Sequence, residues 1–543
     1  MKTRIHTDKA PAAIGPYSQA VLAGDFLYVS GQLPLDPVSG AMAGDTAAEQ
    51  AEQSIRNLSA ILEAAGMTLD DVVKTTVLLA DIADFAAVNE VYAKHFTGAV
   101  LPARAAFAVR DLPKGAKVEI ELVAYKGLNR RENAMMTVKE QYRLHDEILK
   151  DRLENLMPAL LAECGVEMWV VLSKEYNEDP VFRTLVPALV KNASRVTCLV
   201  FCRNKDGSYE ALNVSRPNPR FDGYYKQAMN RKDDVFEALN HLIAKKKPAK
   251  VHVDISNECA LADGLSKNLY DRLQTALCGS VPLVSAEEIV IRWIETRTAR
   301  EMELYPMIYK LSMDVVDEVF SADFIKPGVT TTTDVEWGIM QRINDYGLPF
   351  WFAPDIDLQR KGGDDFRMSG VVIEEGDIVH CDMGLTCLGL HTDTQRNVYI
   401  GRKGETEIPA GILAAFRTGN RFQDIVRSSF AVGKTGNEIF FAAMEKAKAE
   451  GIQAMSYCHP IGTYGHSAGP SVGMYDNQGF VPGHGELVMH DNTCYALELN
   501  ITQNVPEWDN QPVCMMLEET IGFSGGKTFF LDDKREILRF VRT

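Results

Sequence analysis

The alternation of apolar and polar positions in the first part of the chain predicts a small domain of mixed helices and strands. Apolar side chains recur with strand or helix periodicity in five segments. They predict a strand, a helix, a strand, a helix and a strand at residues 26–30, 48–62, 72–79, 85–96 and 118–125. Thr46 and Glu49 have the spacing of a helix capping box, and Gly66 ends the first helical pattern. Residues 1–127 are therefore expected to form one α+β domain.

A polar segment without apolar periodicity follows this domain. It reads GLNRRENA, and the paired Met135 and Met136 after it resemble the start of a once separate chain. Polar segments of this kind are typical of connections between domains. We therefore predict a linker at residues 128–136.

Two further domains are expected after the linker. Strand patterns at 168–172 and 197–202 alternate with helical patterns at 142–164 and 234–246, which predicts an α/β domain over 137–293. That domain has no dense cluster of candidate ligands, so we expect it to be structural or to act as a lid, and to help assembly. The last domain, 294–543, opens with a helical pattern over 298–320 and continues with apolar strands that carry single acids.

Composition limits the function more than the fold. A chain of 543 residues is too long for one hydrophobic core, and its 46% hydrophobic content is ordinary for a globular protein. The net charge of −17 opposes binding to nucleic acid or to an anionic membrane. No signal peptide and no apolar stretch of about 18 residues is visible. The ten cysteines form no CxxC pair, so we expect a cytoplasmic protein with reduced thiols.

Four acids and one histidine in the last domain form the strongest candidate site: Asp382, Asp393, His466, Glu498 and Glu518. Single acids inside apolar strands are rarely buried without a partner. Four carboxylates carry a charge of about −4, which two divalent cations would balance. Carboxylates that bridge suit a pair of metal ions about 3.5–4 Å apart. We therefore predict two divalent metal ions, manganese first, with cobalt, zinc or iron as alternatives.

The segments around these residues resemble the pita-bread metallopeptidase family, which includes prolidase, aminopeptidase P and creatinase. The matching motifs are DMG…TDTQR, GHSAG, ELN and LEET. The resemblance implies a pita-bread α+β metallohydrolase domain at 294–543, preceded by a creatinase-type N-terminal domain at 137–293. It also implies that all five residues bind metal. Glu498 would then act as general base and general acid in the hydrolysis of an amide or related carbonyl.

Two positions depart from the pattern of prolidase-like members. Those members carry another histidine seven residues after the metal-binding one, where this chain has Gly473, and an upstream histidine is missing from WFAPDIDLQR. His391 and His459 are candidates for a substrate-facing role, with a structural role as the alternative. Xaa-Pro specificity therefore stays open. The alternative function is a non-peptide amidohydrolase or a lyase on the same scaffold.

A second group of motifs lies in the first domain. GPYSQ, VSGQ, VN, LPAR and KVEIE form a spaced series, and Arg104 stands in the otherwise apolar run ARAAFAV. A guanidinium there needs an anion, and its planar fork fits a carboxylate. That carboxylate belongs either to a ligand or to Glu119 and Glu121 in a salt bridge at an oligomer seam.

This series is similar to the RidA (YjgF) family of enamine/imine deaminases over nearly all of residues 1–127. The resemblance implies a RidA-like, chorismate-mutase-like fold that hydrolyses 2-imino acids to 2-keto acids and ammonia without a cofactor. It assigns Arg104 to the substrate carboxylate and Glu119 to the activation of water. It gives pocket positions to Tyr17, Ser30, Gly31 and Asn89. Family members are trimers with sites at the subunit seams.

The two ends together predict a bifunctional fusion. One part would hydrolyse a C–N bond of a peptide or small amide with two metal ions, and the other would deaminate 2-imino acids or enamines. Small molecules or short peptides are the expected partners, with no nucleic acid and no membrane. Trimers through the first domain and dimers through the C-terminal part would combine as a hexamer. A RidA-like module that only binds ligands is the alternative from another class.

Overall fold

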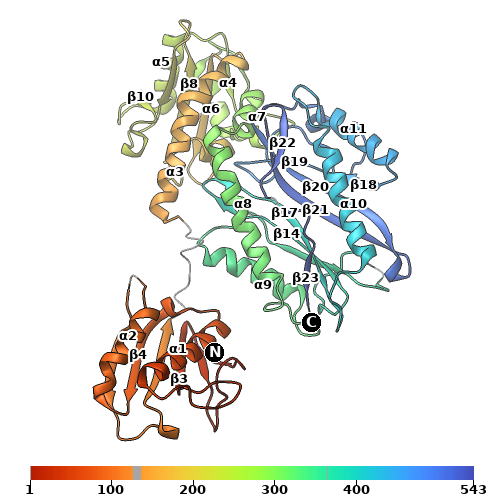
Figure 1. Ribbon diagram of the computed structural model, residues 1–543. Coiled ribbons are helices and arrows are strands. Elements are labelled where there is room, and N and C mark those ends of the chain that lie inside the picture. The colour runs from red at the N-terminus through yellow and green to blue at the C-terminus, as the bar shows by residue number, and fades with distance from the viewer. Residues whose placement is uncertain (1, 99, 126–135, 364, 533, 543) are drawn as a thin grey trace. The chain divides into compact units, whose positions relative to one another are not determined.

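The computed structural model of the protein describes residues 2–98, 100–125, 136–363, 365–532 and 534–542. The chain divides into two compact units, Met1–Met135 and Met136–Thr543, which are described separately (Figure 1). The predicted linker at 128–136 lies outside the described residues, except for Met136.

The first unit is a six-stranded sheet with two helices on one face. The strand order is β1-β2-β3-β6-β4-β5, in which only β4 and β5 are parallel neighbours. The strands are β1 (Lys2–Ile5), β2 (Ala20–Ala23), β3 (Phe26–Gln32), β4 (Val72–Leu79), β5 (Ala103–Ala108) and β6 (Val118–Tyr125). The helices are α1 (Ala47–Ala64) and α2 (Phe85–His95). All five elements predicted for this part of the chain are confirmed.

Local sequence explains where α1 begins and which face it buries. The hydroxyl of Thr46 accepts the Glu49 N–H at 3.2 Å, and the Glu49 carboxylate accepts the Thr46 N–H at 3.0 Å, which closes the predicted capping box. The apolar face of α1 packs on the alternate side chains of β6, such as Ile120 and Leu122. Glu119 therefore stands on the sheet face away from this core, where it is only half-buried.

The second unit has two lobes, and the first lobe (136–298) is a sheet covered on both faces. The strand order is β10-β9-β8-β7-β11-β12. The strands are β7 (Met168–Lys174), β8 (Val196–Arg203), β9 (Tyr209–Asn213), β10 (Lys226–Gln227), β11 (Val251–Val253) and β12 (Leu283–Ser285). The helices are α3 (Val138–Asp151), α4 (Met157–Glu163), α5 (Val235–Lys246), α6 (Lys267–Leu277) and α7 (Glu287–Glu295).

The sequence pattern accounts for this layering. Trp169 and Val171 belong to a core shared with α4 and α7, whereas Val170 and Leu172 belong to a core shared with α5 and α6. Both faces of β7 are therefore buried, as its continuous apolar run predicts. The helix predicted at 142–164 consists of α3, a π-helical turn and α4 in succession.

The second lobe (299–543) is built on a nine-stranded sheet. Its main order is β13-β14-β17-β21-β20-β18, while β19 pairs with β20, β22 with β21 and β23 with β17. The strands are β13 (Asp355–Gln359), β14 (Ile378–Met383), β17 (Thr394–Ile400), β18 (Gln453–Ser456), β19 (His459–Ile461), β20 (Thr493–Val505), β21 (Gln511–Ser524), β22 (Lys527–Phe530) and β23 (Arg539–Val541). A small separate hairpin joins β15 (Thr386–Cys387) to β16 (Leu390–His391).

Four helices belong to this lobe: α8 (Ala299–Val319), α9 (Thr332–Asp345), α10 (Ala410–Arg427) and α11 (Gly436–Ala449). The predicted helix at 298–320 is confirmed as α8, which a Thr298–Glu301 capping box begins. Phe416, Phe422 and Val426 of α10 pack against the apolar side chains of β20 and β21. The opposite face of these strands carries polar side chains and is where the candidate metal site lies.

Two further expectations concern the whole chain. All ten cysteines are free thiols. Within the described residues, every helix is too short or too polar to cross a lipid bilayer.

Candidate active sites

Four polar side chains of the second lobe form a row across four adjacent strands. In the sheet register Asp382 of β14 faces Gln395 of β17, Gln395 faces Glu518 of β21, and Glu518 faces Glu498 of β20. Directly paired residues on neighbouring strands project from the same face of the sheet. The register therefore brings together three of the four predicted acids, although they lie up to 136 residues apart in sequence (518 minus 382).

The fourth acid joins the row through a turn. Asp393 precedes β17, and its main chain is fixed to Thr520 of β21, whose hydroxyl donates to the Asp393 carbonyl at 2.8 Å. Oxygen atoms of Asp382, Asp393 and Glu518 all lie within 4.8 Å of one another. The β15–β16 hairpin lies between the two aspartates in sequence and connects them.

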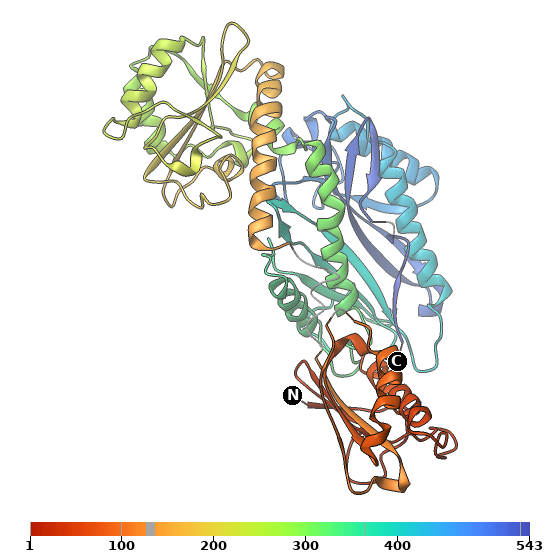
Figure 2. The ribbon, with the colours of Figure 1, turned by 60° about the vertical axis from the view of Figure 1, so that its left-hand side comes forward.

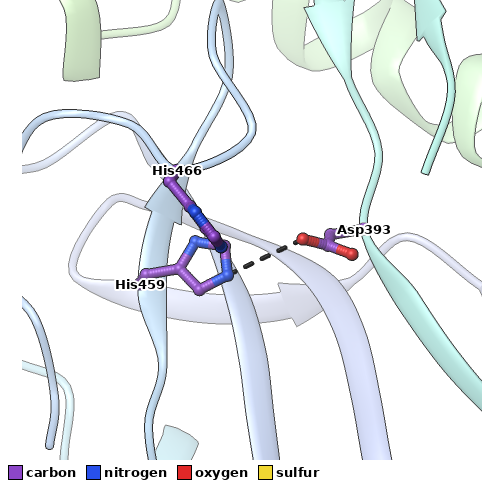
Figure 3. A group of neighbouring side chains, drawn as sticks. All are labelled: Asp393, His459 and His466. Carbon is purple, nitrogen blue, oxygen red and sulfur yellow. Dashed lines mark ion pairs between the residues drawn. The ribbon is translucent and has the colours of Figure 1, made fainter. Parts of the chain in front are cut away.

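Two histidines approach these carboxylates, and His459 lies the more central. Its Nε2 lies 3.7 Å from Asp393, 3.9 Å from Glu498 and 3.8 Å from Glu518. Figure 3 shows the His459 ring directed at Asp393, with His466 beside it. His466 falls within the 4.8 Å grouping only with Asp393 and His459. The strand β19 explains the central position, because His459 pairs with Ala496, two residues from Glu498 on the same face of β20.

The structure bears on the seven-residue spacing that prolidase-like members show between two histidines. Gly473, seven residues after His466, has a φ of 79°, and a Cβ there would lie 2.1 Å from the Ser456 carbonyl oxygen. No side chain fits that position. His466 itself lies seven residues after His459, which is the spacing expected between a metal-binding histidine and the histidine that follows it.

The electrostatics of the cluster favour added positive charge. Burial, above all, raises the pKa of Asp382 to about 6, and burial together with repulsion from Asp382 raises the pKa of Glu498 to about 8. Burial and neighbouring carboxylates hold the pKa values of Asp393 and Glu518 well above their usual range. Burial also lowers the pKa of His459 to about 4, so its imidazole is neutral and keeps a lone pair for a metal ion.

These residues fit a pair of divalent cations. Nε2 of His459 and Oδ1 of Asp382 are buried and have no hydrogen-bond partner among the described residues. Buried polar atoms without partners are rare unless an ion or water completes them. Carboxylate oxygens with imidazole nitrogen match the preferences of manganese, cobalt, iron and zinc.

Sequence reasoning missed two residues at this site. The Gln395 amide donates to Glu498 at 2.5 Å and to Asp382 at 3.3 Å. In the sequence, the TDTQR motif contains Gln395 but gives no sign of these contacts. Trp351 lies edge-on to His466 at 5.3 Å between ring centres, and its Nε1 donates to the Thr392 carbonyl at 2.8 Å. The ring centre of His391 lies 6.0 Å from that of the same tryptophan, and its Nδ1 donates to the Gly462 carbonyl at 3.2 Å, so His391 lies outside the group of carboxylates.

A cavity of about 480 Å³ opens from the candidate metal-binding residues. Its lining includes His459, His466 and Glu498 from the second lobe, and it also includes residues 258–261 from the first lobe. The first lobe therefore forms one wall of the site. The expectation that this lobe is structural or acts as a lid stays a prediction.

The residues predicted for the first unit fall into two groups. The guanidinium of Arg104 on β5 lies 4.6 Å from the ring centre of Tyr92, on the same helix as Asn89. Glu119 on β6 lies against Gly31 of β3, where an added Cβ would be 2.0 Å from the carboxylate. Ser30 donates its hydroxyl to the Ser18 carbonyl at 2.8 Å, and Tyr17 is exposed nearby in sequence.

The sheet register separates these two groups within one chain. Arg104 pairs with Thr75, which is fully buried beneath the helices, whereas Glu119 pairs with Leu78, whose side chain points to the other face. Arg104 and Glu119 therefore project from opposite faces of the sheet. No ion pair joins them among the described residues of one chain, and the salt bridge at an oligomer seam stays a prediction. Burial and repulsion from Glu121 raise the pKa of Glu119.

Two family models match separate parts of the chain. The model described as Endoribonuclease L-PSP matches residues 7–126, and the model described as Metallopeptidase family M24 matches residues 308–524. The first part is 57% identical over 123 residues to the 2-iminobutanoate/2-iminopropanoate deaminase of Rattus norvegicus. That alignment covers 23% of this chain and 89% of the relative. The human deaminase is 54% identical over the same length, again with 89% of the relative covered.

A solved structure resembles the second unit. It is the X-Pro aminopeptidase of Thermotoga maritima, with a TM-score of 0.53 and 16% sequence identity. The alignment covers 72% of this chain and all of that structure. At this identity the likeness establishes the fold of both lobes, as the resemblance to the pita-bread family predicts.

Proposed function

The chain belongs to the RidA family through its first domain and carries an M24 metallopeptidase domain after it, and we propose that these form a bifunctional enzyme of C–N bond hydrolysis. The first domain hydrolyses 2-imino acids or enamines to 2-oxo acids. The second hydrolyses the amide bond of a short peptide or small amide. The observation that supports the second activity most directly is the row of carboxylates on one sheet face with an imidazole at its centre.

We assign the metal-binding role to Asp382, Asp393, Glu498, Glu518 and one imidazole. His459 is the better candidate for that imidazole, because its Nε2 lies within 3.9 Å of three of the carboxylates. His466, at the margin and seven residues later, then faces the substrate. The competing arrangement is the one that the family resemblance implies, with His466 on the metal and His459 as a candidate to face the substrate.

For amide hydrolysis, the protein itself has to supply a correctly placed group that transfers protons. Two divalent ions, when bound, polarise a carbonyl and lower the pKa of water towards ~7. Glu498 takes the proton of the attacking water and delivers it to the leaving nitrogen. Gln395 holds the Glu498 carboxylate in place through its 2.5 Å hydrogen bond.

The cavity lining bears on the substrate. Among the described residues that line it there is no lysine or arginine, while Glu258 and Asp476 both contribute carboxylates. A dipeptide presents its free carboxylate close to the bond that is cleaved, and the described lining offers no lysine or arginine to bind it. We therefore favour longer peptides or amides without a neighbouring carboxylate over Xaa-Pro dipeptides.

The site of the first domain is completed by a second copy of the chain. Because Arg104 and Glu119 project from opposite faces of the sheet, one protomer cannot present both to one substrate. A trimer would bring the Arg104 group of one protomer to the Glu119 group of the next. This supports a homo-oligomer built through the first domain.

One experiment tests both activities on the full chain. Bound metal is quantified, the protein is reloaded with manganese, cobalt or zinc, and hydrolysis is measured on a panel of Xaa-Pro dipeptides, longer Xaa-Pro peptides and N-acyl amino acids. We expect about two metals per chain and cleavage that Glu498→Gln abolishes. Deamination of 2-iminobutanoate generated in situ is measured in parallel and is expected to need Arg104 but no metal. A metal-free protein under every loading condition would remove the proposed hydrolase.

A further inference from the structure

Away from the metal site, two adjoining cavities lie between the lobes of the second unit. Their volumes are about 420 Å³ and 290 Å³, and His145, Arg183 and Leu388 are among the residues that line both. Their walls come from α3, from the segment 183–191 and from the β15–β16 hairpin. Figure 2 shows α3 lying beside the second lobe. Cavities of roughly 300–1,000 Å³ are the usual size of small-molecule sites.

The larger cavity carries two cationic side chains that pair with no carboxylate among the described residues. Arg183 and Lys191 both line it, and neither forms a hydrogen bond or ion pair with any residue the structure describes. The Lys191 ammonium lies 4.5 Å from the ring centre of Tyr142. The one carboxylate among the described lining residues of either cavity, Glu301, is held by Arg152 and Arg297 at 2.8 Å each. The charge of Arg183 and Lys191 is thus available to a ligand.

Apolar side chains occupy the space beside these cations. Val186, Val190, Leu348 and Leu388 line the larger cavity together with prolines. A ligand with one anionic head and a short alkyl body would contact both kinds of surface, whereas an inorganic anion would leave the apolar part uncovered. A carboxylate suits a guanidinium next to an ammonium.

We propose that the two adjoining cavities, called the groove from here on, form a second binding site for a short-chain monocarboxylate of the 2-oxo acid type. The monocarboxylate class follows from the lining. The choice of a 2-oxo acid rests on the proposed function of the first domain, whose product has this chemistry.

The groove is connected to the metal site through the β15–β16 hairpin. Thr386 and Leu388 of this hairpin line the groove, and the hairpin joins Asp382 to Asp393. At its other end His391 stacks on Tyr464 and lies edge-on to Trp351, which contacts His466. A ligand that contacts and shifts the hairpin would therefore change the distance between the carboxylates of Asp382 and Asp393. Linkage requires that metal ions change the affinity of the ligand by the same factor.

Binding is tested by calorimetry with 2-oxobutanoate on the full-length Arg104→Ala protein, which removes carboxylate binding in the first domain. The double substitution Arg183→Gln with Lys191→Gln should raise the dissociation constant about tenfold or more. Lys232→Gln, an exposed cation of the same lobe outside both cavities, is the matched control. Both altered residues are exposed, so the fold should be retained, and a circular-dichroism melt checks it.

The binding data also have to show that the groove prefers a monocarboxylate to an inorganic anion. Unchanged affinity in the double variant, or equal competition by inorganic phosphate, would overturn the site. Manganese affinity, measured against a chromophoric chelator, should change about threefold or more with 2-oxobutanoate in the control and stay constant in the double variant. An identical manganese affinity with and without the ligand would overturn the connection to the metal site. None of these readouts depends on catalysis, so failure of the proposed deaminase shows separately in its own assay.

Discussion

At the scale of single residues, the two imidazoles of the metal site occupy different positions. Nε2 of His459 has three carboxylates within 3.9 Å and no hydrogen-bond partner among the described residues. His466 lies at the margin, against the edge of Trp351. These positions support the proposal that His459 holds a metal ion and His466 meets the substrate.

Substitution should separate these two roles. His459→Ala is expected to weaken manganese binding by about tenfold or more, because it removes a ligand at the centre of the cluster. His466→Ala should keep the metal content and lower turnover instead. Metal analysis after dialysis and calorimetric titration provide the measurements. The reverse pattern would restore His466 as the ligand.

Glu119 supports a prediction about pH. Burial and the nearby Glu121 raise its pKa, and the carboxylate form is the one that activates water. Deamination should therefore fall as the pH drops, at a pH above the ordinary range of a glutamate. Glu121→Gln removes the repulsion and should move this acidic limb to lower pH, which a pH–rate profile of both proteins would reveal. An identical profile in both would refute the coupling.

At the scale of elements, the indole of Trp351 is wedged between two glycines. An added Cβ would lie 2.1 Å from the indole at Gly384 and 2.4 Å from it at Gly465. These contacts fix the tryptophan beside His466 and His391. The segment before β13 thereby reaches the site, where prolidase-like relatives are expected to have a histidine.

The wedge predicts a pairwise interaction. Gly465→Ala should destabilise the second unit by about 1–3 kcal/mol through overpacking. Trp351→Leu combined with Gly465→Ala should recover part of that loss, because the smaller side chain makes room. Denaturant unfolding of the two single variants and the double variant measures the interaction. Strictly additive effects would contradict it.

The elements also show which parts of the site the sequence could predict. Asp382, Glu498 and Glu518 were predictable because each is a single acid inside an apolar strand. The central place of His459 was not, because it depends on the pairing of β19 with β20, in which His459 lies opposite Ala496, 37 residues away (496 minus 459). Arg104 and Glu119 were identified as a pair by motif alone. Their placement on opposite faces follows from the register of β4 with both neighbours.

At the scale of the whole molecule, the two compact units should unfold separately. Calorimetry of the full chain is expected to show two transitions, and manganese should raise only that of the second unit, since a ligand stabilises the state that binds it. A shift of both transitions would indicate that the units unfold together.

The stability of the metal-free protein should depend on pH through the carboxylates of the candidate metal site. The folded-state pKa values of Asp382, about 6, and Glu498, about 8, exceed those of the unfolded chain. The folded state therefore binds more protons, so the stability of the second unit should fall as the pH rises from about 5 to 8. Melting temperatures with and without manganese should diverge over this range. A metal-free melting temperature that is constant or rises with pH would contradict this.

The direct pairing of Glu498 with Glu518 has a consequence for how the protein matures in the cell. Two acids opposite each other near the middle of strands of 13 and 14 residues weaken the β-ladder there, because without cations they are buried either protonated or as like charges. The longest hairpin of the lobe is thus weakest at its centre until cations arrive. Freshly synthesised chains would exchange their central amide hydrogens quickly, and metal supply would set the moment at which this hairpin closes.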